Sequence, residues 1–185
     1  MRDLSLHLLD LVQNSITAGA SLITIRLSLE ESGMLTMTLE DNGKGMSPEL
    51  LERVTSPFAT TRTTRKVGLG IPMMKENAEK AGGSFTLESE EGKGTVLTAT
   101  MDTRNIDCLP LGDLAGTLLS LLLTNPLFPE FLFTGRSPKG EGTFDTREVR
   151  AALGSDIPFN EPAVAAWLKE AIEEEINSIF GGVLV

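Results

Sequence analysis

The sequence predicts an α/β (α+β) two-layer sandwich, in which helices cover one face of a mixed β-sheet. Apolar residues recur with helical spacing in two segments of the first hundred residues and alternate with polar residues in four others. The predicted order is a helix, two strands, a short helix, a long loop, a helix and two strands, which is typical of helices packed on a sheet. The last 83 residues predict a helical and hairpin appendage to this sandwich.

The first three elements follow from local patterns. Residues 3–18 carry an amphipathic repeat, with Asp3 as a candidate N-cap and Gly19 as a candidate stop. Residues 22–29 and 34–39 mostly alternate apolar and polar side chains. Because a turn sequence joins these two strands, they are predicted to form a hairpin.

The rest of the sandwich follows in the same way. The segment Ser47-Pro48-Glu49 begins a short helix, with serine as the cap and proline at the first position. Residues 53–68 are irregular and rich in threonine. Helical spacing returns over 70–81, and the strands 84–88 and 95–101 follow it.

Residues 103–185 are predicted to form a second unit of unknown role, beside a first unit of residues 1–102. They supply −6 of the net charge of −10 and six of the nine prolines. The expected elements are an apolar helix, a strand pair, a short helix and a last helix, at residues 111–124, 130–134 with 142–145, 146–153 and 162 onward. Trp167 lies in the apolar stripe of the last helix, so it is expected either to pack or to anchor an interface. Either the last helix or a partner must cover the apolar helix, and homodimerisation stays open.

Composition excludes several classes of protein. A single Cys and a single His exclude an intramolecular disulfide framework and a structural zinc site. The net charge of −10 argues against general nucleic-acid binding and against an anionic membrane surface. No targeting signal or membrane-spanning run is present, so a cytoplasmic location is expected.

Two polar constellations are candidates for chemistry. Asp10 and Asn14 are four residues apart, so they share one helix face, with His7 one turn earlier. An Asn oxygen can ligate Mg²⁺ and a carboxylate can accept a proton, although a solvated helix face has the same pattern. The second constellation runs from Glu40 to Met46. It fits a turn, and it also fits a ligand site in which Asp41 accepts a hydrogen bond from an amine and two glycines let the backbone pass a flat ligand.

A third constellation points to phosphate. Gly68-Leu69-Gly70 leads into a helix, whose free amides and dipole favour anions, although a plain loop-to-helix junction also fits. Five basic residues and no acidic residue lie between positions 53 and 75, in a chain that is acidic elsewhere. A mobile loop that offers Arg and Thr side chains to phosphates explains this asymmetry better than a solvated basic face.

The order and spacing of these signals resemble one known ATP-binding domain, the GHKL or Bergerat fold. It is shared by histidine kinases, gyrase B, a large heat-shock chaperone and MutL. The matching motifs are Asp10-x-x-x-Asn14, Asp41-x-Gly43-x-Gly45, residues 57–62, Gly68-x-Gly70 and Gly94-Thr95. The later motifs look most like the histidine-kinase branch, whereas residues 10–20 look more like MutL.

The resemblance implies a role for each motif. Asn14 would coordinate Mg²⁺ on the phosphates, and Asp41 would bind the adenine amine. Gly43 and Gly45 would let the backbone pass close to the adenine base, and Met46 would follow them in the nucleotide-binding loop. The ATP lid would include Thr60, Thr61 and Arg62. The phosphates would be contacted by Gly68, Leu69 and Gly70, and Thr95 would support the adenine end of the pocket. The implied ligands are ATP or ADP, with Mg²⁺.

Two departures from the family bear on mechanism. Members that hydrolyse ATP generally place Glu where this chain has Asp10, so Asp10 is a shorter candidate base and hydrolysis is expected to be slow or absent. The chain begins at the ATP domain and His7 lies inside that domain. A complete two-component histidine kinase is therefore not expected, and His7 is expected either to line the pocket near Asp10 or to be a partly buried residue of the helix face.

Two functions from different classes follow. The first is an enzyme that hydrolyses ATP or transfers its γ-phosphate to an unidentified partner protein. The alternative is a nucleotide-gated binding module, like an anti-sigma factor, in which ATP and ADP select the partner with little turnover. A nucleotide-free remnant is disfavoured by the intact glycines, Asp41 and Asn14.

Overall fold

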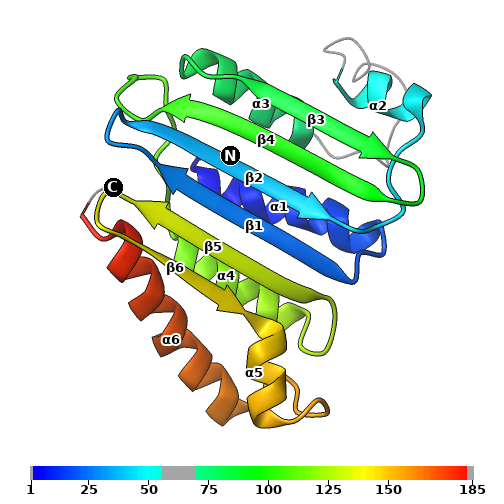
Figure 1. The fold of residues 1–185 in the computed structure, drawn as a ribbon, viewed down its shortest axis with the longest axis vertical. Helices are drawn as coiled ribbons and strands as arrows, with labels where there is room; N and C mark the ends of the chain where they lie inside the picture. The colour runs from blue at the N-terminus through cyan, green and yellow to red at the C-terminus, as the bar shows by residue number, and fades with distance from the viewer. Residues whose placement is uncertain (1, 56–69, 183–185) are drawn as a thin grey trace.

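The protein is built on one mixed six-stranded sheet (Figure 1). The computed structural model describes residues 2–55 and 70–182. In spatial order the strands are β3 (Phe85–Glu90), β4 (Gly94–Asp102), β2 (Met34–Asp41), β1 (Leu22–Leu29), β5 (Glu130–Ser137) and β6 (Gly140–Asp145). Only β1 and β5 pair in parallel among these neighbours. The sheet confirms the predicted mixed α/β architecture and the predicted hairpin of β1 and β2.

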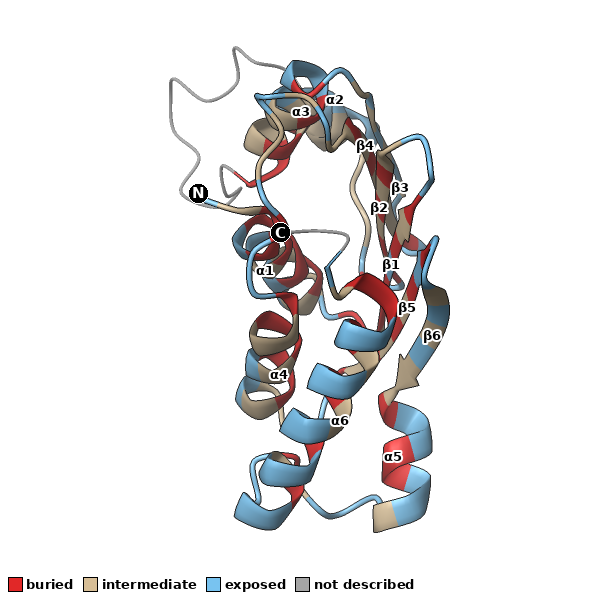
Figure 2. Ribbon diagram, turned by 90° about the vertical axis from the view of Figure 1, so that its left-hand side faces the viewer, coloured by how far each residue is buried: buried red, intermediate tan, exposed pale blue. Residues whose placement is uncertain are grey.

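The described helices are α1 (Leu4–Thr17), α2 (Pro48–Thr55), α3 (Gly70–Lys80), α4 (Leu114–Thr124), α5 (Thr146–Leu153) and α6 (Pro162–Phe180). Most of them form a second layer, whereas α5 follows directly on the end of β6 (Figure 2). Figure 2 shows α1, α4 and α6 on the same side of the sheet, with buried residues facing it. Within the described ranges, no helix combines the length and apolarity needed to cross a membrane.

The position of α1 is set by its cap and its apolar face. The carboxylate of Asp3 accepts a hydrogen bond from the backbone N–H of Leu6 at 2.9 Å, which confirms the predicted N-cap. The buried face of the helix packs toward the sheet, and Gly19 follows with a φ of 75°. As a result, the polar face of α1 is held beside the end of β2, where the candidate site lies.

The last third of the chain extends the same sheet. β5 pairs with β1 from Leu22 opposite Glu130 to Ser28 opposite Arg136. The apolar helix α4 is covered by α6 and by α1. The two segments 1–102 and 103–185 thus contribute strands to the same sheet. Their division into two units stays a prediction.

Trp167 corrects one expectation about packing. Its side chain is 50% exposed, whereas Val164 and Leu168 on either side of it are buried. The buried stripe of α6 is narrower than the apolar stripe of the sequence, and Trp167 lies on its flank. The prediction that Trp167 packs in the core was therefore wrong, and the alternative of an interface anchor stays a prediction.

Candidate functional site

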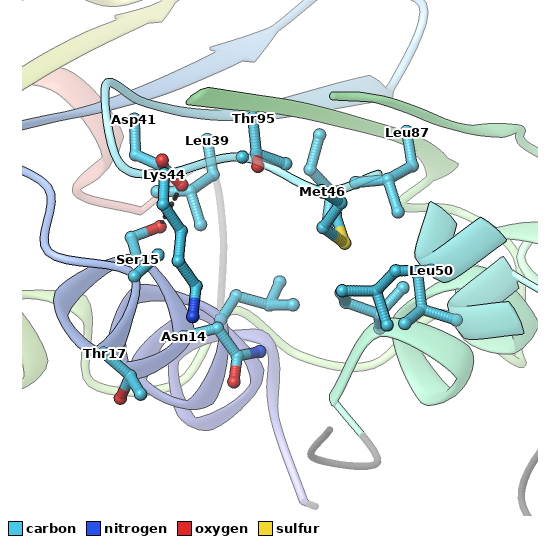
Figure 3. Close-up of a pocket in the computed structure, with 16 residues that line it drawn as sticks. Asn14, Ser15, Thr17, Leu39, Asp41, Lys44, Met46, Leu50, Leu87 and Thr95 are labelled. Atoms are coloured by element: carbon cyan, nitrogen blue, oxygen red, sulfur yellow. Dashed lines mark hydrogen bonds between the residues drawn. The ribbon is translucent and has the colours of Figure 1, made fainter. Parts of the chain in front are cut away.

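A cavity of about 170 Å³ lies between α1, the end of β2 and the start of β4 (Figure 3). Polar side chains of Asn14, Ser15 and Asp41 line one side of it. The other walls are apolar and come from α1, α2, α3, the strands and the loop after β2: Leu11, Leu39, Met46, Leu50, Val54, Ile71, Leu87 and Leu97. A flat apolar ring with a polar edge fits this combination of surfaces.

Asp41 is the buried carboxylate of the cavity. It ends β2 and is only 8% exposed. One carboxylate oxygen accepts a hydrogen bond from the Ser15 hydroxyl at 2.6 Å, and the other accepts one from the Gly43 N–H at 2.9 Å. Each oxygen has further acceptor capacity, so the fixed carboxylate can receive a donor from a ligand.

Ser15 is a site residue that the sequence did not identify. It falls on the buried face of α1 with the leucines, a position that is typical of core packing. Its hydroxyl instead lines the cavity and holds Asp41. The one available signal was a polar side chain among the apolar residues of that face, directly after Asn14.

Thr95 lies on β4 directly opposite Asp41 on β2. Its side chain lines the cavity, and its hydroxyl is 2.9 Å from the hydroxyl of Ser89 on β3. Ser89 also accepts a hydrogen bond from the backbone N–H of Met46 at 2.9 Å. The hydroxyls of the two strands therefore position the loop that follows Asp41.

That loop is held at both sides by backbone hydrogen bonds. The N–H of Lys44 donates to the carbonyl of Ala18 at the end of α1, and the N–H of Gly92 donates to the carbonyl of Lys44. Asn42 accepts from the N–H groups of Ser21 and Leu22. These hydrogen bonds fix the loop at one side of the cavity, and its residues Gly45 and Met46 line the cavity.

The glycines of this loop make close approaches to the protein itself. A Cβ on Gly43 would lie 3.0 Å from the carbonyl oxygen of Ala18, and one on Gly45 only 2.0 Å from the carbonyl oxygen of Glu90. Gly45 also has a φ of 65°. The structure therefore gives these glycines a packing reason, and backbone contact with a ligand stays a prediction.

Replacing Gly45 with alanine is expected to lower the free energy of unfolding by about 2–3 kcal/mol, through left-handed strain and the clash with Glu90. Gly92→Ala is the matched control, since Gly92 has a φ of 82° but no atom within 4 Å of an added Cβ. Urea unfolding measures both variants. Equal losses in the two would show that the close approach to Glu90 contributes nothing.

The structure separates Asn14 from Asp10. Asn14 lines the cavity, and Figure 3 shows its side chain projecting from α1 near the end of the Lys44 side chain. Asp10 is exposed and does not belong to the described cavity lining. It lies against the start of α3, where a Cβ on Gly70 would be 3.4 Å from the Asp10 Cβ. Asp10 and Gly70 therefore lie close to each other, next to the cavity and outside its described lining.

His7 is fully buried between α1 and α3. Its Nε2 lies 2.8 Å from the amide nitrogen of Asn77, which can only donate, so this contact requires an unprotonated Nε2. No described group hydrogen-bonds the buried Nδ1. Burial lowers the pKa of His7, and the nearby carboxylates of Asp10 and Asp3 oppose that shift only in part. His7 is thus a buried residue that joins two helices, and it does not line the cavity.

His7 should make folding sensitive to acid. Its pKa is lower in the folded protein than in the unfolded chain, so the unfolded state gains the proton first as the pH falls below about 6.5. Stability is fully present above that pH and is lost below it, by at most about 1.4 kcal/mol per pH unit. Denaturant unfolding of wild type and His7→Gln between pH 7.5 and 5 measures this loss, because the chain has no other histidine. Parallel pH profiles would contradict the expectation.

Five predicted site residues lie outside the described residues: Thr60, Thr61, Arg62, Gly68 and Leu69. Those that the structure brings together at the cavity are Asn14, Asp41, Gly45, Met46 and Thr95. Besides Ser15, Lys44 and the aliphatic walls are parts of the site that no sequence motif predicted. Aliphatic residues that line a ligand cavity have the same sequence pattern as those of a core.

Comparison with known proteins gives one family match and several partial relatives. Residues 2–105 match the family model described as histidine kinase-, DNA gyrase B-, and HSP90-like ATPase. The sensor histidine kinase ZraS of Salmonella typhimurium is 38% identical over 93 residues, which are 49% of this chain and 20% of that protein. Sporulation kinase E of Bacillus subtilis is 38% identical over 86 residues, or 46% of this chain and 11% of that protein. The chain therefore spans a fifth or less of these relatives.

A solved structure shares the fold of nearly the whole chain. The crystal structure of the N-terminal domain of a DNA repair protein covers 98% of this chain and 58% of its own, with a TM-score of 0.53. Its sequence identity is 17%, so the likeness concerns the fold alone.

Proposed function

The chain belongs to the family of histidine kinase-, DNA gyrase B- and HSP90-like ATPases, and on that basis we propose that it binds Mg·ATP in the cavity beside Asp41. We propose further that it hydrolyses ATP or transfers the γ-phosphate to a partner protein. The observation that carries the proposal is the buried carboxylate of Asp41, fixed by Ser15 and Gly43 at the wall of an aliphatic cavity.

The adenine base would enter the cavity with its amine toward Asp41. An ionised carboxylate is an acceptor-only group, so it suits the exocyclic amine of adenine and not the carbonyl of guanine. Thr95 and Met46 would support the base from β4 and from the loop, and the aliphatic walls would cover its faces. The threonines and Arg62 of the proposed lid, with Gly68, Leu69 and Gly70, would meet the phosphates.

The donor set at the cavity mouth fits a magnesium ion that borrows most of its ligands. No group of three or more His, Cys, Asp or Glu side chains in the described ranges could hold a metal by itself. The amide oxygen of Asn14 would supply one ligand, and phosphate oxygens and water the others, as is usual for Mg²⁺. When bound, the ion would neutralise phosphate charge.

Asp10 is the residue on which turnover depends in this proposal. It lies one turn before Asn14 on α1 and next to the start of α3, where phosphates would bind. There its carboxylate would accept a proton from an attacking water or from a partner's hydroxyl or imidazole, directly or through a water.

A second candidate function is a nucleotide-gated binding module with little turnover. The position of Asp10 favours this alternative, since the side chain is exposed, outside the described cavity lining, and one methylene shorter than glutamate. In this module ATP and ADP would differ in how they order the lid, and that difference would select the protein partner.

Two measurements test the proposal and separate the candidates. Calorimetry of the full chain with ATP, with and without Mg²⁺, is expected to give one site per chain. Phosphate release, measured with and without candidate partners, then distinguishes an enzyme from a gated module. An absence of any adenine-nucleotide binding would contradict both.

A further inference from the structure

Lys44 is the cationic side chain of the cavity. Among the described residues that line the cavity, it is the only one with a positive charge. It comes from the loop after β2, and Figure 3 shows its side chain extending toward Asn14 on α1. Its side chain therefore runs from the Asp41 end of the cavity to the mouth, where the proposed magnesium ligand lies.

The backbone of Lys44 is fixed more firmly than that of an ordinary exposed lysine. Its N–H donates to the carbonyl of Ala18 at 2.9 Å, and its carbonyl accepts from the N–H of Gly92 at 2.7 Å. These bonds join the end of α1 to the turn between β3 and β4. The Cα position is thus set by two elements, while the residue as a whole is exposed.

The Lys44 ammonium group lies in a region whose other described charged side chains are carboxylates. Asp41 is negative at the inner end, and Asp10 is negative beside the start of α3. A polyphosphate that leaves the cavity past Asn14 would carry further negative charge toward Asp10. A lysine that reaches the mouth offsets part of that repulsion, because a charged hydrogen bond to phosphate is stronger than a neutral one.

We propose that Lys44 binds the first phosphates of the nucleotide and so makes the cavity select nucleotides over nucleosides. This inference rests on the proposed function, since it assigns a ligand group to the same cavity. Adenosine would use only Asp41 and the aliphatic walls. AMP, ADP and ATP would also meet the ammonium of Lys44 at the mouth.

The competing explanation for Lys44 is structural. A cation near the last turn of a helix interacts favourably with the helix dipole, and Lys44 lies beside the end of α1. That role predicts a loss of stability without any dependence on phosphate. The two explanations therefore differ in which ligands respond to a mutation.

The test is calorimetry of the full chain with adenosine, AMP, ADP and ATP, each with Mg²⁺, for wild type, Lys44→Ala and Lys44→Arg. Lys44→Ala is expected to weaken the three phosphorylated ligands by about tenfold and adenosine by less than about twofold. Lys44→Arg keeps the charge and is expected to restore most of the affinity for nucleotides.

Lys93→Ala is the matched control. Lys93 lies in the adjoining turn, is paired with Glu90 at 2.7 Å, and is outside the cavity lining. Its loss is expected to change none of the four affinities. Equal weakening of adenosine and ATP by Lys44→Ala, or no weakening of either, would overturn the inference while leaving the proposed function intact. If wild type binds none of the four ligands, the proposed function fails and the inference fails with it.

Discussion

Replacing Asp41 with asparagine is expected to weaken ATP binding by at least about a hundredfold. The carboxylate already accepts hydrogen bonds from Ser15 and Gly43, and it would accept a third from the adenine amine. An asparagine keeps one acceptor oxygen and replaces the other with a donor nitrogen. The Gly43 N–H and the adenine amine can only donate, and a Ser15 hydroxyl that turns to accept from the amide gives up its own bond to that side chain, so one buried donor loses its acceptor.

Two variants frame that result. Ser15→Ala removes one of the two hydrogen bonds that hold Asp41, so an intermediate loss of about tenfold is expected. Asp107→Asn alters an exposed carboxylate away from the cavity and is expected to bind ATP like wild type. Calorimetry measures all three. Wild-type affinity in Asp41→Asn would mean that the nucleotide lies elsewhere on the protein.

Replacing Asp10 with asparagine is expected to lower the rate of phosphate release by about a hundredfold, as for the loss of a general base. The affinity for ATP is expected to stay within about twofold of wild type, because Asp10 is outside the described cavity lining. Asp10→Glu extends the carboxylate by one methylene and is expected to raise the rate. The longer side chain would carry the carboxylate further from α1 than that of Asp10.

Gln13→Ala is the control for Asp10, since Gln13 is exposed on the same helix and also outside the cavity lining. Phosphate release under saturating ATP is compared across the four proteins. Unchanged release in Asp10→Asn, with ATP binding intact, would remove the catalytic role of Asp10. Undetectable release in wild type and in Asp10→Glu would favour the nucleotide-gated module.

Local patterns predicted the secondary structure well because each element has its own signal. The Asp3 cap, the alternation over 22–29 and the apolar run of α6 all reflect interactions within a few residues. The parallel pairing of β1 with β5 depends on contacts about a hundred residues apart, and no local pattern encodes it. The hairpin predicted for the last third of the chain is present as β5 and β6, and the sheet that it joins could not be predicted.

The candidate site was predictable where glycine, Asp and Asn occur at set spacings, and less so where single side chains change role. Ser15 and Trp167 both lie among apolar helix residues. Ser15 contacts Asp41 because the end of β2 lies beside α1, which the sequence of α1 does not encode. Trp167 is exposed because the buried stripe of α6 is narrower than its apolar stripe. Lys44 had no spacing signal, because its direction depends on the loop that Gly45 shapes.

The central claim is that adenine lies in the cavity beside Asp41, and intermolecular nuclear Overhauser effects test it most directly. In a complex of the full chain with Mg·ATP and methyl-labelled protein, the adenine protons are expected to show contacts to the methyl groups of Met46, Leu87 and Leu97. Contacts only to methyl groups outside the cavity, such as those of Leu127, Ile157 or Val149, would contradict the claim even if ATP binds tightly.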